Sequence, residues 1–299
     1  MPVKIKEITE KIKRINWKEW IRKPVFWTVA VSILTGVTVL AFLAIALINP
    51  ADRPQPPEDT FQSEYISEAT EATLPPPEAN PIGLGDFYMD GDYLSCLYTP
   101  SVLGIDVSFW QGEIDWPLVK GAGVEFAMIR AGCRYSGNGE LDVDDFARTN
   151  YEGATQAGVK IGAYFFSQAT TVEEAVVEAD YLLDIIKDWN VEMPVVFDWE
   201  IDPEGRTAKV DGRTLTDCTK AFCDRIRQAG YTPMIYFSKS QSLDTLYLRE
   251  LTDYGFWLAH YDTVLNYPYK IDMWQYSETG SVPGIAGNVD INLYFPWEE

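Results

Sequence analysis

Short apolar strands alternate with helical segments from residue 101 onward, and this alternation restricts the folds open to the chain. Alternating strands and helices predict a parallel sheet with right-handed crossovers, and eight strands favour a closed barrel. An open doubly wound sheet is the alternative, but no Gly-rich phosphate loop supports it. The eight β-rich runs lie at 103–110, 126–132, 160–168, 193–200, 232–239, 255–261, 271–277 and 289–295.

Helical patterns separate the first six runs but not the last three. The strongest pattern is 171–190, where Thr171 is a predicted N-cap and Glu174 completes a capping box. The predicted fold is therefore α/β: an irregular TIM-like (β/α)5(β)3 barrel. The other helical segments are 144–158, 215–230, 240–254 and a shorter turn after 115–117.

The beginning of the chain has a different composition. Residues 1–24 carry eight basic side chains against three acidic ones, and residues 25–48 are 24 residues without a charge. About 20 apolar residues cross a bilayer as a helix, and a basic flank predicts a cytoplasmic N-terminus. We expect a retained single-pass anchor at 25–48. A cleaved signal peptide is the alternative, because Ala44-Ile-Ala46 resembles a cleavage site, although signal-peptide cores usually run ~7–15 residues.

Residues 49–100 are predicted to be an extracytoplasmic linker, disordered until about residue 82. They hold nine of the eighteen prolines and ten acidic residues against one basic residue. The barrel domain would then occupy 101–299. The formal net charge of −21 argues against nucleic acid as a partner, because nucleic-acid binding needs basic patches. Cys96, Cys133, Cys218 and Cys223 match no metal spacing, and both disulfides and free thiols stay open.

Four acidic residues fall in or beside predicted strands, where βα barrels place their chemistry. Asp106 lies on the first strand, Asp198 and Glu200 share one face of the fourth, and Asp290 lies on the last. In a closed barrel the first and eighth strands are neighbours, so Asp106 and Asp290 should lie close together. An acid at a strand end is more often a cap or loop residue, and Asp202 fits that description. Two carboxylates on one buried face raise each other's pKa, which keeps an acid protonated near neutral pH.

Counting residues excludes several chemistries. His260 is the only histidine, so a histidine-rich metal site is impossible, and strand parity places this residue opposite Trp257 and Tyr261. We therefore interpret His260 as structural. An all-carboxylate Mg²⁺ or Ca²⁺ site stays open as a minor alternative. Glycoside hydrolysis is the commonest carboxylate chemistry, and aromatic side chains near the acids suit the apolar faces of sugars.

Six fragments in a fixed order carry a resemblance to a known family. They are GIDVSFWQGEIDW (104–116), AYFFS (163–167), VVFDWE (195–200), WLAHY (257–261), MWQYS (273–277) and VDIN (289–292). Together they resemble the glycoside hydrolase family 25 lysozymes, the Chalaropsis-type muramidases, over about residues 102–297. The resemblance implies a barrel of five βα units plus three strands. It also implies cleavage of the β-1,4 bond between N-acetylmuramic acid and N-acetylglucosamine in peptidoglycan, without a metal or another cofactor.

The resemblance also implies a role for each acid. Glu200 matches the general acid, Asp198 matches the acid that assists the substrate acetamido group or a water, and Asp106 and Asp290 match acids that shape the charge of the cluster. The matching groove-lining side chains are Tyr164, Trp257, Tyr261, Trp274 and Gln275.

We therefore expect a membrane-anchored muramidase whose catalytic domain faces the cell wall and binds peptidoglycan glycan strands. The main rival is a barrel that binds or scaffolds glycans without catalysis. A third possibility is a hydrolase of another N-acetylated polysaccharide. The sequence does not distinguish retention from inversion, because that depends on distances.

Overall fold

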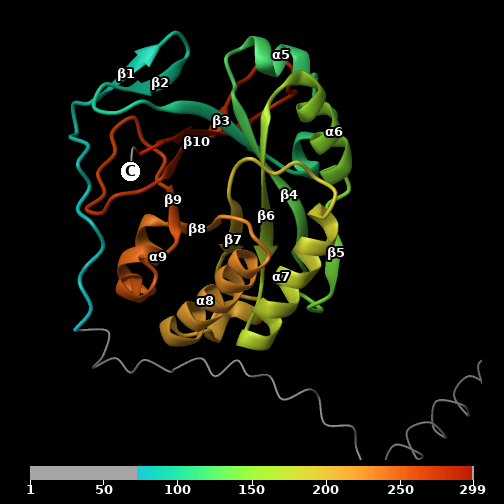
Figure 1. Ribbon diagram of the computed structural model, residues 1–299, viewed down its shortest axis with the longest axis vertical. Coiled ribbons are helices and arrows are strands. Elements are labelled where there is room, and N and C mark those ends of the chain that lie inside the picture. Colours follow the sequence, from blue (N-terminus) through green and yellow to red (C-terminus); the bar gives the residue numbers. More distant parts are fainter. Residues whose placement is uncertain (1–72, 298–299) are drawn as a thin grey trace, which may run out of the picture. The chain divides into compact units, whose positions relative to one another are not determined.

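Eight strands close into a barrel in the computed structural model, which describes residues 73–297 (Figure 1). Neighbours around the barrel follow the order β3-β11-β10-β9-β8-β7-β6-β4, and a pairing between β3 and β4 closes the ring. All eight predicted strands and the closed barrel are confirmed. The strands are β3 (Val102–Val107), β4 (Phe126–Arg134), β6 (Lys160–Ser167), β7 (Val195–Trp199), β8 (Pro233–Ser238), β9 (Gly255–Ala259), β10 (Met273–Gly280) and β11 (Val289–Tyr294).

The predicted cytoplasmic segment 1–24, the predicted membrane span 25–48 and the first part of the predicted linker lie outside the described residues. Within residues 73–297, no helix has the length and apolar character needed to cross a membrane.

The last barrel strand runs against the others. Strands β3 through β10 pair in parallel around the ring, whereas β11 is antiparallel to both β10 and β3. The start of β11 therefore lies at the same end of the barrel as the carboxyl ends of the parallel strands. We call this end the mouth of the barrel, and the first residues of β11 meet the last residues of the other strands there. A short strand that was not predicted from the sequence, β5 (Leu141–Val143), pairs antiparallel with the carboxyl end of β4.

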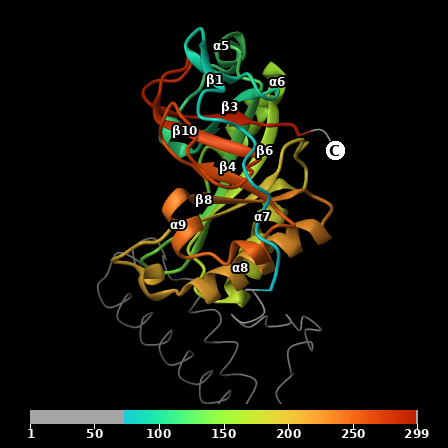
Figure 2. The same ribbon diagram turned by 90° about the vertical axis from the view of Figure 1, so that its left-hand side faces the viewer.

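Helices cover the outside of the barrel, and α7 and α8 lie side by side in both views (Figures 1 and 2). Thr171 caps α7 as predicted, since its hydroxyl accepts from the Glu174 N–H at 3.3 Å. The predicted capping box is displaced by one residue, because the Glu174 carboxylate accepts from the Thr170 N–H. The predicted helix 240–254 is short α9 followed by a 3₁₀ turn. The helices are α5 (Trp116–Gly121), α6 (Ala147–Ala157), α7 (Val172–Ile186), α8 (Gly212–Gln228) and α9 (Lys239–Asp244), with 3₁₀ turns η2 (Phe109–Gln111), η3 (Arg206–Lys209) and η4 (Leu248–Glu250).

Two apolar clusters divide the core according to strand parity. One cluster fills the barrel interior, and the other lies between the strands and the helices. On β7, Val196 belongs to the interior cluster, whereas Val195 and Phe197 belong to the outer one. The interior is tightly filled: a Cβ on Gly104 would come within 2.2 Å of the Phe126 ring. Packed side chains therefore close the barrel below its mouth.

The folded unit begins before the predicted boundary at residue 101. Residues 73–86 run along the barrel (cyan in Figure 1), with Glu78 ion-paired to Lys270 at 2.9 Å and Ile82 buried. A hairpin of β1 (Phe87–Asp90) and β2 (Tyr93–Cys96) follows. The predicted linker is therefore ordered against the barrel over its last part. All four cysteines are free thiols in the structure.

Candidate active site

Four carboxylates converge at one end of the barrel, three of them on strands and one, Glu200, directly after β7. Strand alternation on β7 turns Asp198 toward the barrel axis and Trp199 toward the helices, where its indole N–H donates to the Ala169 carbonyl at 2.8 Å. Asp198 and Glu200 line one depression of about 220 Å³ together with Asp106 from β3 and Asp290 from β11. The four predicted acids therefore share one site. Asp202 lies in the following loop, as predicted, where it accepts from the Ser136 hydroxyl at 2.5 Å.

Asp106 and Asp290 form a hydrogen-bonded pair across the β3–β11 pairing, where their Cα atoms are in register. The Asp106 Oδ2 accepts from Gln275 Nε2 at 2.9 Å and from Asn292 Nδ2 at 2.8 Å. Burial and then the negative charge of Asp106 raise the pKa of Asp290 to about 8. Burial also raises the pKa of Asp106, and the two amide donors act against that shift. Asp290 therefore holds the proton of the pair at neutral pH and donates it to Asp106.

Asp198 and Glu200 differ in their exposure to solvent. Asp198 is buried, and its Oδ1 has no hydrogen-bond partner among the described residues. Burial and then the charge of Glu200 raise the pKa of Asp198 well above its usual range. Glu200 is exposed at the edge of the depression. Desolvation by the surrounding residues and then the charge of Asp106 raise its pKa. The negative charge of one carboxyl therefore disfavours ionisation of the other, and only Glu200 is open to a large ligand.

Aromatic side chains form the floor and rim of the depression. Tyr164 and Trp257 are buried on the floor, with ring centroids 6.2 Å apart in an edge-to-face arrangement. The Trp257 indole N–H donates to the Asn292 side chain at 2.8 Å. Tyr261 is 49% exposed at the rim, so it is available to a ligand. Of the three predicted aromatic residues placed here, Tyr261 presents the most surface to solvent.

The prediction that Trp274 lines the groove is wrong. Trp274 is fully buried in the outer cluster, where its ring meets Phe87 edge to face at 4.8 Å, and it does not line the depression. Adjacent strand residues face opposite sides, so β10 can direct Gln275 or Trp274 toward the barrel axis, but not both. Gln275 is the inward residue. Besides its bond to Asp106, its Oε1 accepts from the hydroxyls of Tyr236 at 2.9 Å and Tyr261 at 3.2 Å.

Several residues of the site were not predicted. Arg130 on β4 lines the depression and is ion-paired with Asp144 at 2.7 Å. Asn292 shares the inward face of β11 with Asp290, so the alternation in VDIN could have identified it. Trp110, 75% exposed at the rim, is the last residue of the predicted run 103–110 but lies in the turn η2 after β3. Arg130 and Trp110 carried no signal that distinguished them from ordinary strand and loop residues.

A second depression of about 870 Å³ continues from the first, because Glu200, Tyr236 and Tyr261 line both. His260 lines the second depression and not the acidic one, consistent with its expected absence from the acid cluster. It nonetheless lies on the same side as Tyr261. Strand β9 ends at Ala259, and the parity argument that separated these two residues does not extend past that end. The two depressions form one groove, with Glu200 at their junction.

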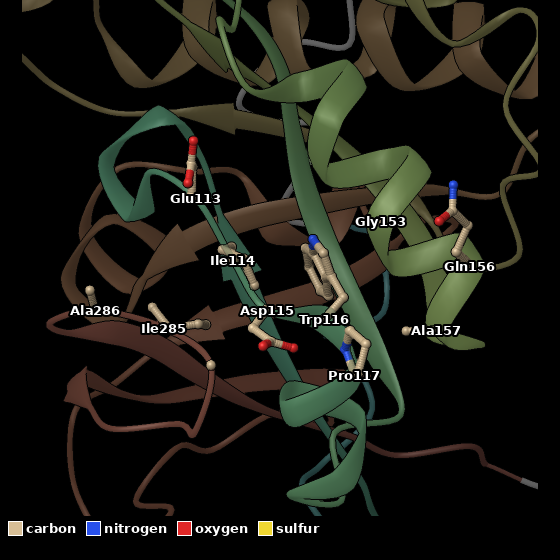
Figure 3. Close-up of a pocket in the computed structure, with 11 residues that line it drawn as sticks. Glu113, Ile114, Asp115, Trp116, Pro117, Gly153, Gln156, Ala157, Ile285 and Ala286 are labelled. Carbon is tan, nitrogen blue, oxygen red and sulfur yellow. The ribbon is translucent and has the colours of Figure 1, made fainter.

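A third depression, of about 920 Å³, shares no residue with this groove (Figure 3). It lies between residues 113–117, helix α6 and residues 284–286. Its two carboxylates, Glu113 and Asp115, lie well apart in Figure 3, and Asp115 caps α5 by accepting from the Leu118 N–H. Although it is larger than either part of the groove, this depression has no converging acids. Across residues 73–297, no group of three or more His, Cys, Asp and Glu side chains is arranged to hold a metal ion.

Comparisons with known proteins agree on one family. The family model described as glycosyl hydrolases family 25 matches residues 105–285. Lysozyme M1 of Streptomyces globisporus is 31% identical over 255 residues, covering 76% of this chain and 83% of the relative. The autolytic lysozyme of Clostridium acetobutylicum is 28% identical and covers 64% of this chain and 55% of the relative. The crystal structure of a bacterial lysozyme from Streptomyces coelicolor is 30% identical with a TM-score of 0.53, covering 66% of this chain and 93% of that one.

Proposed function

This chain belongs to the glycosyl hydrolases family 25, and on that premise we propose that it cleaves peptidoglycan as an N-acetylmuramidase. It is a glycoside hydrolase, and the bond cut is the β-1,4 link from N-acetylmuramic acid to N-acetylglucosamine. The observation that carries the proposal is the position of Glu200. This exposed carboxyl with a raised pKa lies at the junction of the two depressions, beside three further acids.

Glu200 acts as the general acid. Cleavage requires a proton on the glycosidic oxygen as the bond breaks, and a carboxyl with a raised pKa carries that proton near neutral pH. Glu200 can reach an oxygen that lies between a sugar in one depression and a sugar in the other. Its backbone is held in place, since the Glu200 carbonyl accepts from the Gln168 side chain at 2.8 Å.

Asp198 acts on the sugar that gains positive charge. Its Oδ1 is buried without a protein partner, so it is free to bind the acetamido N–H of that sugar or a nucleophilic water. The Asp106–Asp290 pair shares one proton and places one further negative charge nearby, which favours an oxocarbenium-like transition state. Gln275 and Asn292 are positioning residues, because they act through Asp106.

The same proposal places the enzyme at the membrane. Residues 25–48 are long enough to span a bilayer, and the basic residues before them favour a cytoplasmic N-terminus. The catalytic domain would then face the cell wall from outside the membrane. Protease protection of the N-terminal segment in intact cells, together with protease access to the barrel, tests this arrangement.

The test of the activity compares Glu200→Gln with Glu204→Gln in the full-length protein. Glu204 is an exposed acid of the same loop, so its variant controls for the loss of one charge. We expect release of reducing ends from purified cell walls to fall by about 10²–10⁴-fold for E200Q, and to stay near wild type for E204Q. Full activity in E200Q would refute the assignment.

The same assay separates the rival functions. A wild-type protein that binds walls without releasing reducing ends would be a glycan-binding barrel. Faster cleavage of chitin fragments than of walls would assign another N-acetylated polysaccharide. NMR of the first anomer released distinguishes retention from inversion.

A further inference from the structure

The second depression contains a cation that pairs with no carboxylate of the described residues. Lys239 and Arg130 are the lysine and arginine side chains that line the two depressions. Arg130 is ion-paired with Asp144, whereas Lys239 Nζ donates to the Asn266 carbonyl and forms no ion pair with a carboxylate of residues 73–297. An ammonium group has three donors, so further donors of Lys239 remain for a ligand. In a chain of net charge −21, this free cation in the groove is suited to an anionic group.

His260 adds a second polar group to the same depression. Its Nε2 is buried and has no hydrogen-bond partner within the described part of the chain. Burial and the neighbouring charge of Lys239 lower the pKa of His260, so the imidazole is neutral at physiological pH. A buried polar atom without a partner costs free energy, and a ligand that supplies the partner recovers it. Lys239 and His260 therefore offer a charged donor and a neutral polar group side by side.

The position of the acids fixes which part of a substrate enters this depression. The sugar whose anomeric carbon gains charge lies with Asp106, Asp198 and Asp290 in the smaller depression. Glu200 protonates the oxygen at the junction, so the leaving part of the strand extends into the larger depression. That depression has about four times the volume of the first, which allows more than one sugar unit.

We propose that the Lys239–His260 side of the groove binds a stem-peptide carboxylate on the leaving part of the glycan strand. This inference rests on the proposed function. The sugars of peptidoglycan alternate, so the first leaving sugar is N-acetylglucosamine and the second is N-acetylmuramic acid, which carries the peptide. Lys239 binds the carboxylate, and His260 hydrogen-bonds to a neighbouring amide or sugar hydroxyl. The site thereby favours strands that still carry their peptides over stripped strands.

The test compares two forms of one polymer: glycan strands with their stem peptides, and the same strands after an amidase has removed the peptides. The measured quantity is the ratio of kcat/KM on the two forms, determined for full-length wild type, Lys239→Gln and Lys160→Gln. Lys160 is an exposed lysine at the start of β6, at the end of the barrel opposite the mouth, so K160Q controls for the charge change.

We expect wild type and K160Q to share a preference for peptide-bearing strands, and K239Q to lose about two- to fivefold of it, as for a solvent-accessible ion pair. Raising the salt concentration should reduce the preference of wild type and leave that of K239Q almost unchanged. An unchanged ratio in K239Q, the same loss in K160Q, or no preference in wild type would overturn the proposal. If wild type cleaved neither polymer, the muramidase function itself would fail, which is a distinguishable result.

Discussion

Replacing Asp290 by asparagine should raise the stability of the fold at alkaline pH. The pKa of Asp290 is raised from 3.8 to about 8, chiefly by burial and then by the charge of Asp106. Below pH 4 the carboxyl is protonated in both the folded and the unfolded chain. Between pH 4 and pH 8 the folded chain keeps a proton that the unfolded chain has lost, so the stability of wild type falls as pH rises through this range.

The size of the effect follows from the shift. Each pKa unit corresponds to about 1.4 kcal/mol, so the full shift would amount to about 6 kcal/mol. The mouth is open to solvent and the neighbouring acids redistribute protons, so we expect about 1–3 kcal/mol to remain. The side chain of the D290N variant would not titrate, and its amide can still donate to Asp106. The variant should therefore match wild type near pH 4 and exceed its unfolding free energy by about 1–3 kcal/mol at pH 8.

Thermal unfolding of the full-length protein at pH 4, 6 and 8 measures this difference. A domain of this size gains about 2–4 °C in Tm per kcal/mol, so the advantage of D290N at pH 8 should be about 2–12 °C. Asp253→Asn, at an exposed aspartate outside the groove, is the control and should show no such trend. A difference between D290N and wild type that does not grow from pH 4 to pH 8 would contradict the proton-sharing pair.

Three further predictions concern packing, positioning and substrate contact. Gly104→Ala should lower the unfolding free energy by about 1–3 kcal/mol in denaturant titrations, because its Cβ would come within 2.2 Å of the Phe126 ring. The control Gly137→Ala has open space around its Cβ and should leave the unfolding free energy almost unchanged. Equal effects of the two substitutions would refute the packing argument. Gln275→Ala should reduce kcat about tenfold while the circular dichroism spectrum stays native, because the buried carboxylate of Asp106 loses a hydrogen-bond donor. An unchanged kcat would show that Gln275 does not position Asp106. Trp110→Ala should raise KM for glycan strands severalfold with little change in kcat, because this exposed rim indole can stack on a sugar; an unchanged KM would exclude that contact.

The barrel could be predicted because both of its cores leave a pattern in the sequence. Each strand packs one face against the interior and the other against helices, so the strands appear as short apolar runs separated by helical periods. The same alternation correctly separated Asp198 from Trp199 on β7. The same alternation is incompatible with the prediction that Trp274 and Gln275 both line the groove, because adjacent residues of β10 face opposite sides.

The ordered part of the predicted linker could not be anticipated in the same way. Its proline and acid content is typical of disorder, and only distant residues hold it in place. The Lys270–Glu78 ion pair and the bridge between Ala79 and Tyr269 both join residues about 190 positions apart. Local composition has no information about such contacts. For the same reason, the aromatic residues of the β1–β2 hairpin did not predict which part of the barrel they pack against.

The direction of the last strand is the step that connects the fold to the site. Asp290 is the second residue of β11, and a parallel β11 would have placed it at the closed end of the barrel, far from Asp198. Proximity to Asp106 therefore requires the antiparallel pairing that the structure has. The short, helix-free connection before β11 permits this reversal, because antiparallel strands need no long crossover. A clustered acid at the start of a final strand, with no helix before it, thus indicates both the strand's direction and its place in the site.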